Sequence, residues 1–261
     1  MIRLLIRWWA PLLVALSLTT PAWAETPPNI AAAADLRFAL TEVAAAFQRD
    51  TGRTVSLTFG SSGNFFRQIQ QGAPFQLFLS ADEQYALDLA RAGKTQGPGT
   101  LYAVGRLALV APKGSPLRVD ERLSGLRAAI ARGQITRFAI ANPEHAPYGD
   151  RAMEALKHTR LWDALSGKLV LGDSVTQAFQ FAVSGGAQGG IVAYSLVRDP
   201  AFAARTDFAL LPASWHRPLL QRMVLIKGAS ETASRFYAYI QGPTARHILT
   251  RYGFALPNAR R

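Results

Sequence analysis

The chain contains, at residues 29–52, the stretch NIAAAADLRFALTEVAAAFQRDTG. Its opening part, Asn29–Ala34, is a short apolar run that predicts a buried strand. The apolar residues after Asp35 recur at helical spacing: Leu36, Leu40, Val43 and Phe47. Gly52 follows at the place where a helix commonly ends in a left-handed residue. A buried strand that leads into an amphipathic helix predicts a βα unit, the building block of α/β proteins.

The same alternation continues on both sides of the centre of the chain. Further strands are predicted at residues 54–59, 77–79, 138–141, 169–171 and 189–193, with helices between them. Two longer apolar runs, Leu101–Pro112 and Leu219–Ile226, lack helical spacing and predict strands that cross between lobes. We therefore expect two α/β lobes, the first formed by residues 25–106 and 219–261 and the second by residues 107–218.

The N-terminus has the features of a cleavable export signal. Arg3 and Arg7 precede an apolar stretch, Leu12–Leu18, and Ala22-Trp23-Ala24 has the form of a signal-peptidase site. The stretch is too short to span a bilayer, which takes roughly 20 apolar residues. We expect residues 1–24 to be removed, which leaves 237 of the 261 residues. The chain has no cysteine, which excludes disulfides, thiolate metal sites and an N-terminal lipid anchor, so we expect a periplasmic protein.

The charge of the chain favours anions without indicating nucleic acid. The formal net charge is +12, or +10 without the two signal arginines. The basic residues are scattered, and no run of them is interleaved with aromatic residues. We expect no nucleic-acid partner, and a diffuse positive field that favours encounters with small anions.

Several predicted junctions present the start of a helix, where unpaired backbone N–H groups and the helix dipole attract anions. The first is Ala33-Ala34-Asp35, although Asp35 is equally well explained as a helix N-cap. The second is the predicted turn Gly60-Ser61-Ser62-Gly63, whose hydroxyl groups can donate to an anion. The third is Ser174-Val175. A Pro-flanked loop, residues 142–149, directs Tyr148, whose hydroxyl group needs a partner if it is buried.

The chain resembles the periplasmic molybdate-binding proteins of ABC transporters over its whole mature length. The motifs that carry the resemblance are AAADL (32–36), GSSG (60–63), RQI (67–69), GAP (72–74), LFLSADE (77–83), NPEHAPYG (142–149), DSVTQA (173–178), GGIVAY (189–194), QGP (241–243) and RYGF (251–254). LFLSADE and NPEHAPYG together are quite specific, whereas GSSG alone is not.

The resemblance implies a type II periplasmic binding protein, with a βα sheet sandwich in each lobe and the ligand in the cleft between them. The implied function is capture of molybdate, and of tungstate, for delivery to an ABC permease in the inner membrane. It further implies a monomer that is not an enzyme and has no cofactor and no directly bound metal cation. Other oxyanions such as phosphate or sulfate stay open as ligands, as does ferric ion through Tyr148 and Tyr194. A hydrolase is disfavoured because the four histidines are isolated and no GxSxG motif is present.

The resemblance also implies ligand-binding residues at matching positions. Ser62 matches a hydroxyl ligand, Tyr148 a donor from the second lobe and Val175 a backbone N–H donor. Ala34 and Asp35 occupy the first-loop position, and two further candidates are Ser61 beside Ser62, and Tyr194, one residue past the position where some members place a tyrosine.

Asp35 departs from the family, whose members have Ser or Asn at that position. A carboxylate facing a dianion would repel it, so Asp35 must point away, be protonated or meet a ligand that carries a proton. We expect it to cap the helix that it opens by accepting N–H bonds two or three residues on. Such a cap would lower the pKa of Asp35.

Overall fold

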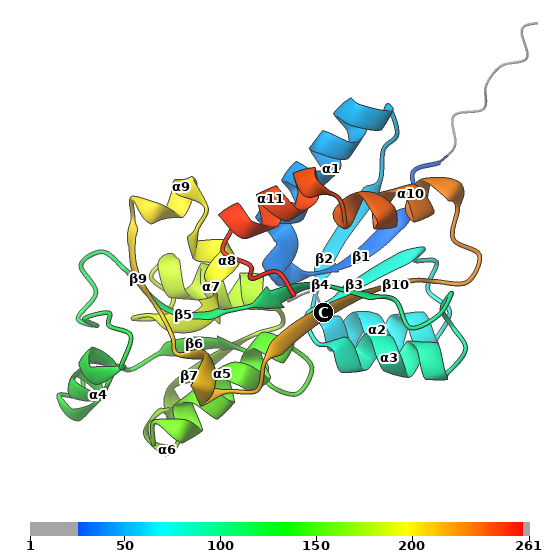
Figure 1. Cartoon of the computed structure of the whole chain (residues 1–261). Coiled ribbons are helices and arrows are strands. Elements are labelled where there is room, and N and C mark those ends of the chain that lie inside the picture. Colours follow the sequence, from blue (N-terminus) through cyan, green and yellow to red (C-terminus); the bar gives the residue numbers. More distant parts are fainter. Residues whose placement is uncertain (1–25, 258–261) are drawn as a thin grey trace, which may run out of the picture.

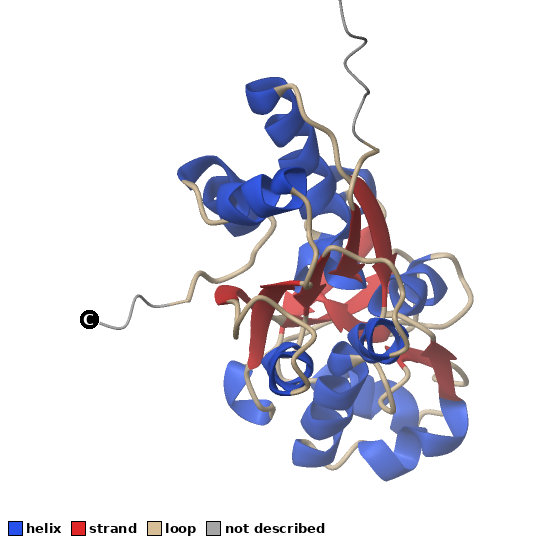
Figure 2. Ribbon diagram, turned by 90° about the vertical axis from the view of Figure 1, so that its right-hand side faces the viewer, coloured by secondary structure: helices blue, strands red, loops and turns tan. Residues whose placement is uncertain are grey.

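The structure is a computed structural model that describes residues 26–257. The expected signal peptide, residues 1–24, lies outside the described residues. Among the described residues, no helix is long and apolar enough to cross a membrane. The chain forms two five-stranded sheets, each flanked by helices, and this confirms the predicted α/β class (Figures 1 and 2).

The first sheet is built from the two ends of the described chain. Its strands are, in spatial order, β2 (Ser56–Gly60), β1 (Asn29–Ala33), β3 (Leu77–Ser80), β10 (Leu219–Leu225) and β4 (Thr100–Gly105). β1 is parallel to β2 and β3, and β10 runs antiparallel to β3 and β4.

The second sheet repeats this arrangement with the middle of the chain. Its strands are, in order, β7 (Leu169–Gly172), β6 (Phe138–Ala141), β8 (Gly190–Ala193), β5 (Leu107–Pro112) and β9 (Thr206–Leu210). β6 is parallel to β7 and β8, and β5 is antiparallel to β8 and β9. Both sheets therefore have a parallel part closed by an antiparallel strand from a distant segment.

Helices cover both faces of the first sheet. One face carries α1 (Arg37–Thr51), α10 (Glu231–Ile240) and α11 (Pro243–Arg251), and the other carries α2 (Ser62–Gln70) and α3 (Glu83–Arg91) (Figure 1). The strands are buried on both sides: Ile30 packs toward the first group of helices and its neighbour Ala31 toward the second. This is why these strands are apolar runs rather than alternating patterns.

The second sheet has more and shorter helices around it. They are α4 (Ser124–Ala131), α5 (Pro147–His158), α6 (Trp162–Leu165), α7 (Val175–Val183), α8 (Tyr194–Val197) and α9 (Pro200–Ala203). Three short 3₁₀ segments complete the described elements: η1 (Ala34–Leu36), η2 (Ser166–Lys168) and η3 (Ala213–Trp215).

The first βα unit forms largely as its sequence predicts. Leu40, Val43 and Phe47 are buried along one face of α1, and Gly52 caps its end with a φ of 71°. The entry to the helix differs from the prediction. Asp35 lies in the 3₁₀ turn η1, and α1 begins only at Arg37.

The apolar run Leu101–Pro112 is two strands rather than the single one predicted. Gly105 pairs with Leu219 in the first sheet, and Leu107 pairs with Ala193 in the second, so the chain changes sheets at Arg106. The prediction of a crossing strand at Leu219–Ile226 was also wrong, because β10 lies wholly in the first sheet and the return path precedes it. Apolarity marks both runs as buried strands, but pairing partners far along the chain decide which sheet each joins.

Two predicted loops are shorter than expected because helices begin inside them. α2 begins at Ser62, so GSSG is a direct passage from strand to helix rather than a separate turn. α5 begins at Pro147, so Tyr148 lies in the first turn of a helix rather than in a loop. Proline is favoured at this first position because its missing N–H has no intrahelical partner there.

Candidate functional site

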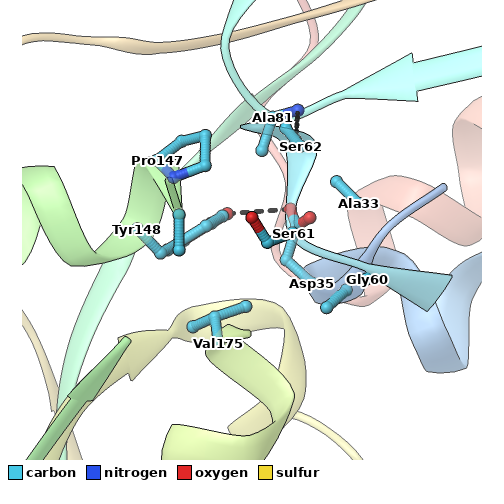
Figure 3. Close-up of a pocket in the computed structure, with 11 residues that line it drawn as sticks. Ala33, Asp35, Gly60, Ser61, Ser62, Ala81, Pro147, Tyr148 and Val175 are labelled. Atoms are coloured by element: carbon cyan, nitrogen blue, oxygen red, sulfur yellow. Dashed lines mark hydrogen bonds between the residues drawn. The ribbon is translucent and has the colours of Figure 1, made fainter. Parts of the chain in front are cut away.

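A small cavity lies between the two sheets, where several strands end and helices begin (Figure 3). It is lined by Ala33, Ala34, Asp35, Gly60, Ser61, Ser62 and Ala81 from the first sheet's side and by Ala146, Pro147, Tyr148 and Val175 from the second's. Its volume is about 10 Å³, close to what one water molecule needs. A tetrahedral oxyanion is larger than water, so the lining residues must move apart for one to enter.

Six of the seven residues predicted from the sequence line this cavity: Ala34, Asp35, Ser61, Ser62, Tyr148 and Val175. Tyr194 does not. It opens the short helix α8, its ring lies 6.0 Å from the ring of Phe208, and Gly253 packs against it. The one-residue offset from the family position therefore carries this side chain to another part of the molecule.

Four helical segments begin at the cavity. Ser62 is the first residue of α2, Tyr148 the second of α5, Val175 the first of α7, and Ala34 the first of η1, which continues into α1. The first N–H groups of a helix have no partner within it, and the dipole makes this end positive. Two starts come from each side of the cleft, so the positive ends of helices from both lobes face one cavity, an arrangement that attracts anions.

The two serines of the GSSG passage use their hydroxyl groups differently. Ser62 Oγ accepts the N–H of Ala81 at 3.0 Å and donates to no described residue, so its proton is available to a ligand. Ser61 Oγ donates to the backbone oxygen of His145 at 2.6 Å. The proton of Ser61 is therefore committed to a contact across the cleft, which makes Ser62 the hydroxyl donor of the pair.

Asp35 does not cap its helix, contrary to the prediction. No side-chain cap is formed at the start of η1 or α1. Instead Asp35 Oδ2 accepts a hydrogen bond from the hydroxyl group of Tyr148 at 2.9 Å (Figure 3). It accepts a second one from Gln221 Nε2 at 2.6 Å. Its other oxygen, Oδ1, is buried and accepts no hydrogen bond from the described residues.

The pKa of Asp35 is raised rather than lowered. Burial of the carboxyl group, which is 1% exposed, lifts it to about 6, and the hydrogen bonds from Gln221 and Tyr148 offset only part of this effect. The backbone N–H groups of Asp35 and Leu36 also lower this pKa, but all these donors together do not outweigh the burial of the carboxyl group. None of the described residues that line the cavity is Lys, Arg or His, so no cation compensates the carboxylate.

Two residues behind Asp35 were missed by the sequence analysis. Gln221 lies on β10 and is fully buried, and its Oε1 accepts the hydroxyl proton of Tyr102 on β4 at 2.7 Å. A buried chain of hydrogen bonds thus runs from Tyr102 through Gln221 and Asp35 to Tyr148. One signal was available: Gln221 is a polar residue inside a run predicted to be a buried strand, and buried polar groups need partners.

Gly105 gives the hydroxyl group of Tyr148 its space. A Cβ atom at position 105 would collide with that hydroxyl group and lie 2.9 Å from Gln221 Nε2. Gly105 is the last residue of β4, directly before the passage into the second sheet. The absent side chain at the crossing therefore allows Tyr148 to reach Asp35.

Further hydrogen bonds join the two lobes around η1. Thr176 Oγ1 donates to the backbone oxygen of Ala34 at 2.8 Å, and Ser195 Oγ donates to that of Asp35 at 2.7 Å. At the rim of the cleft, the backbone N–H of Gly63 donates to the oxygen of His145 at 3.0 Å. Together with the Tyr148–Asp35 contact, these bonds describe a closed arrangement of the lobes.

The Ser61–His145–Asp173 cluster at the rim invites comparison with a hydrolase triad. Ser61 Oγ lies 3.0 Å from His145 Nδ1, and His145 Nε2 lies 3.5 Å from Asp173 Oδ1. In a triad the histidine ring takes the serine proton. Here the backbone oxygen of His145 is the closer acceptor, and the side chain of Asp173 is 71% exposed. The cluster is therefore a contact between lobes rather than an activated nucleophile.

A buried arginine fixes the helix that carries Tyr148. Arg151 on α5 pairs with Glu154 at 2.5 Å, with Asp150 at 3.0 Å and with Asp82 of the first lobe at 3.3 Å. Arg217, which precedes β10, contacts Glu154 and Asp150 from the solvent side. Hydrogen bonds from Arg217 and Arg151 outweigh partial burial and lower the pKa of Glu154 to about 2.

Comparison with known proteins agrees with this geometry. The family model of bacterial extracellular solute-binding proteins matches residues 28–255. The molybdate-binding protein ModA of Rhodobacter capsulatus is 37% identical over 86% of each chain. ModA of Azotobacter vinelandii is 35% identical over 87% of this chain and 89% of that protein.

A solved structure supports the same relationship. The periplasmic molybdate-binding protein of Azotobacter vinelandii superimposes with a TM-score of 0.81 at 30% identity and covers 88% of this chain and 100% of that one. The two-lobed type II fold expected from the sequence is thereby confirmed. The chain belongs to the bacterial extracellular solute-binding proteins, in one family with the periplasmic molybdate-binding proteins.

Proposed function

We propose that this protein is the periplasmic component of an ABC importer that captures molybdate, and tungstate, and delivers it to the permease in the inner membrane. One observation carries the proposal: helix starts from both lobes meet at one cavity whose described lining contains no cationic side chain. The names and solved structure of the relatives point to the same ligand.

This chemistry suits a fully ionised tetrahedral oxyanion. Such an anion offers only acceptors, and the site offers backbone N–H groups together with the free hydroxyl proton of Ser62. Hydrogen bonds to a charged acceptor are roughly twice as strong as neutral ones, so a closed shell of donors replaces the lost hydration. The site residues Ala34, Asp35, Ser62, Tyr148 and Val175 are proposed on this basis.

The alternatives have less support. Ferric ion would need Tyr194, which lies outside the cavity. In the part of the chain that the structure describes, no three His, Asp or Glu side chains are grouped so that they could complete such a site. Sulfate and phosphate remain the competing ligands because they share the tetrahedral form. We propose binding without catalysis, since Ser61 gives its proton to a backbone oxygen rather than to a base.

Calorimetric titration with a panel of anions tests the function. We expect submicromolar binding of molybdate and tungstate and much weaker binding of sulfate and phosphate. Ferric citrate and generic esterase substrates serve as negative controls, for which we expect no binding and no hydrolysis. Equal competition by sulfate or phosphate would reject molybdate as the ligand while leaving the oxyanion site in place.

Export and organisation belong to the same proposal. We propose cleavage after Ala24, a monomeric mature protein and lobe boundaries at residues 106 and 219. The change of sheet between β4 and β5 supports the first boundary, and the start of β10 supports the second. Intact-mass measurement on protein from the periplasmic fraction tests the cleavage site, and sedimentation tests the monomer.

A further inference from the structure

Asp35 poses a problem that the proposed function does not solve. Its carboxyl group lines the cavity, and in the ionised form it would face a dianion with no cation among the described lining residues. Like charges in a desolvated site strongly disfavour each other. The donors on Oδ2, Tyr148 and Gln221, are neutral and can only spread the charge.

The geometry of the carboxyl group indicates how the conflict is resolved. Oδ2 is engaged by two donors, whereas Oδ1 is buried without a partner among the described residues. A buried oxygen without a hydrogen-bond partner destabilises the protein unless a proton or a ligand gives it one. Since Asp35 lines the cavity, a proton on Oδ1 would turn this oxygen into a donor for the ligand, and Oδ2 would keep both of its hydrogen bonds.

We propose that Asp35 binds the oxyanion as a carboxylic acid, so that the site takes up one proton from solution together with each dianion. The proton resides on Oδ1 and forms an Oδ1–H···O hydrogen bond to one ligand oxygen. No bond within the anion changes. Asp35 thereby supplies the donor that Ser or Asn supplies in the family pattern, and this inference rests on the proposed function.

The surroundings of Asp35 agree with this assignment. The titratable groups that face it are Tyr148 from α5 and Tyr102 from β4, and burial holds the pKa of each well above its ordinary value, so both stay neutral donors. Ser195 of α8 contacts only the backbone oxygen of Asp35. With a pKa of about 6 in the ligand-free site, the acid form is within reach at neutral pH, and a neighbouring dianion raises the pKa further.

The proposal predicts how the affinity for molybdate changes with pH. Above about pH 6 the free site is mainly ionised and must gain a proton to bind, so the association constant should fall about tenfold per pH unit. Below that pH the proton is already present and the dependence should flatten. Molybdate stays a dianion over the neutral and alkaline part of this range, so the ligand does not contribute the effect there.

Calorimetry of molybdate binding in buffers of different ionisation enthalpy measures the number of protons taken up per molybdate bound. At about pH 7.5 we expect the wild-type protein to take up about one proton more per molybdate than Asp35→Asn, an isosteric variant that donates without titrating. Asp35→Asn should also bind with an affinity that is flat in pH and higher than wild type at alkaline pH. Asp207→Asn, an exposed carboxyl group on β9, is the matched control and should behave as wild type.

The outcomes separate the two proposals. Molybdate binding with the same proton count in wild type and Asp35→Asn would overturn the proton uptake and leave the function intact. Failure of wild type to bind molybdate at any pH would overturn the function. Tight binding of hydrogen phosphate that is lost in Asp35→Asn would mean that an ionised Asp35 accepts a ligand proton, which contradicts both. If Asp35→Asn fails to fold, the absence of proton uptake by wild type alone still refutes the inference.

Discussion

At the scale of single residues, Ser62 supplies a hydroxyl proton with no partner among the described residues. We expect Ser62→Ala to weaken molybdate binding about ten- to a hundredfold, since a hydrogen bond to a buried charge contributes roughly 1.5–3 kcal/mol. Titration calorimetry measures the change. Ser184→Ala, which removes an exposed hydroxyl group at the far end of α7, is the control and should bind normally. Unchanged affinity in Ser62→Ala would make this serine only structural.

Asp35 also ties the stability of the ligand-free protein to pH. Its folded-state pKa of about 6 exceeds the ordinary aspartate value of 3.8. The stabilisation that the protonated carboxyl group contributes is therefore fully present below about pH 4 and is lost as pH rises through about 6. The free energy of unfolding of Asp35→Asn, compared with wild type, should therefore rise by up to about 3 kcal/mol between about pH 4 and pH 7.5. Urea unfolding at several pH values measures this difference, and a constant difference would contradict the raised pKa.

The environment of Asp35 shows where sequence reasoning stops. The local sequence predicted Asp35 to be a helix cap, but its hydrogen-bond partners Tyr148 and Gln221 lie 113 and 186 positions away along the chain. Capping propensity describes neighbours within one turn and cannot anticipate a donor brought in by the other lobe. The places of Ser62 and Val175 at helix starts were easier to predict, because they follow from the local passage of a strand into a helix.

At the scale of elements, α5 is held in place by charges of unequal burial. Arg151→Met should lower the free energy of unfolding by about 3 kcal/mol, because the buried guanidinium group, 3% exposed, balances three carboxylates. Arg217→Met removes a cation that contacts two of the same carboxylates but is 68% exposed, and it should cost less than about 1 kcal/mol. Denaturant unfolding measures the free energy of unfolding of both variants. An equal loss in the two would show that burial of the arginine does not decide how much stability it contributes.

The elements themselves were predictable to an uneven degree. The strand at 138–141 and the buried faces of α1 and α2 follow from periodicity and burial, and they appear as expected. The division of Leu101–Pro112 between two sheets does not, because apolarity is the same on both sides of Arg106. Such a division depends on the pairing of Gly105 with Leu219 and of Leu107 with Ala193, which is a tertiary event.

At the scale of the whole molecule, contacts between the lobes close the cavity, so the lobes must part before an anion can enter. The ligand-free protein should therefore open and close, and an anion bound by donors from both lobes should favour the closed state. Small-angle scattering should show a smaller radius of gyration with saturating molybdate, with sulfate at the same concentration as the control. An identical profile in both would remove the closing motion but not the binding.

Gly105 should make substitutions at positions 105 and 148 depend on each other among homologues of this protein. The missing side chain at the first crossing is what leaves room for the phenolic oxygen of Tyr148 beside Gln221. A lineage that acquires alanine at 105 must give up that oxygen, so phenylalanine or a smaller residue should accompany it at 148. Positions 105 and 148, which lie in different lobes and far apart along the chain, should thus evolve as a pair, and their joint substitution would mark homologues that hold the anion without a tyrosine.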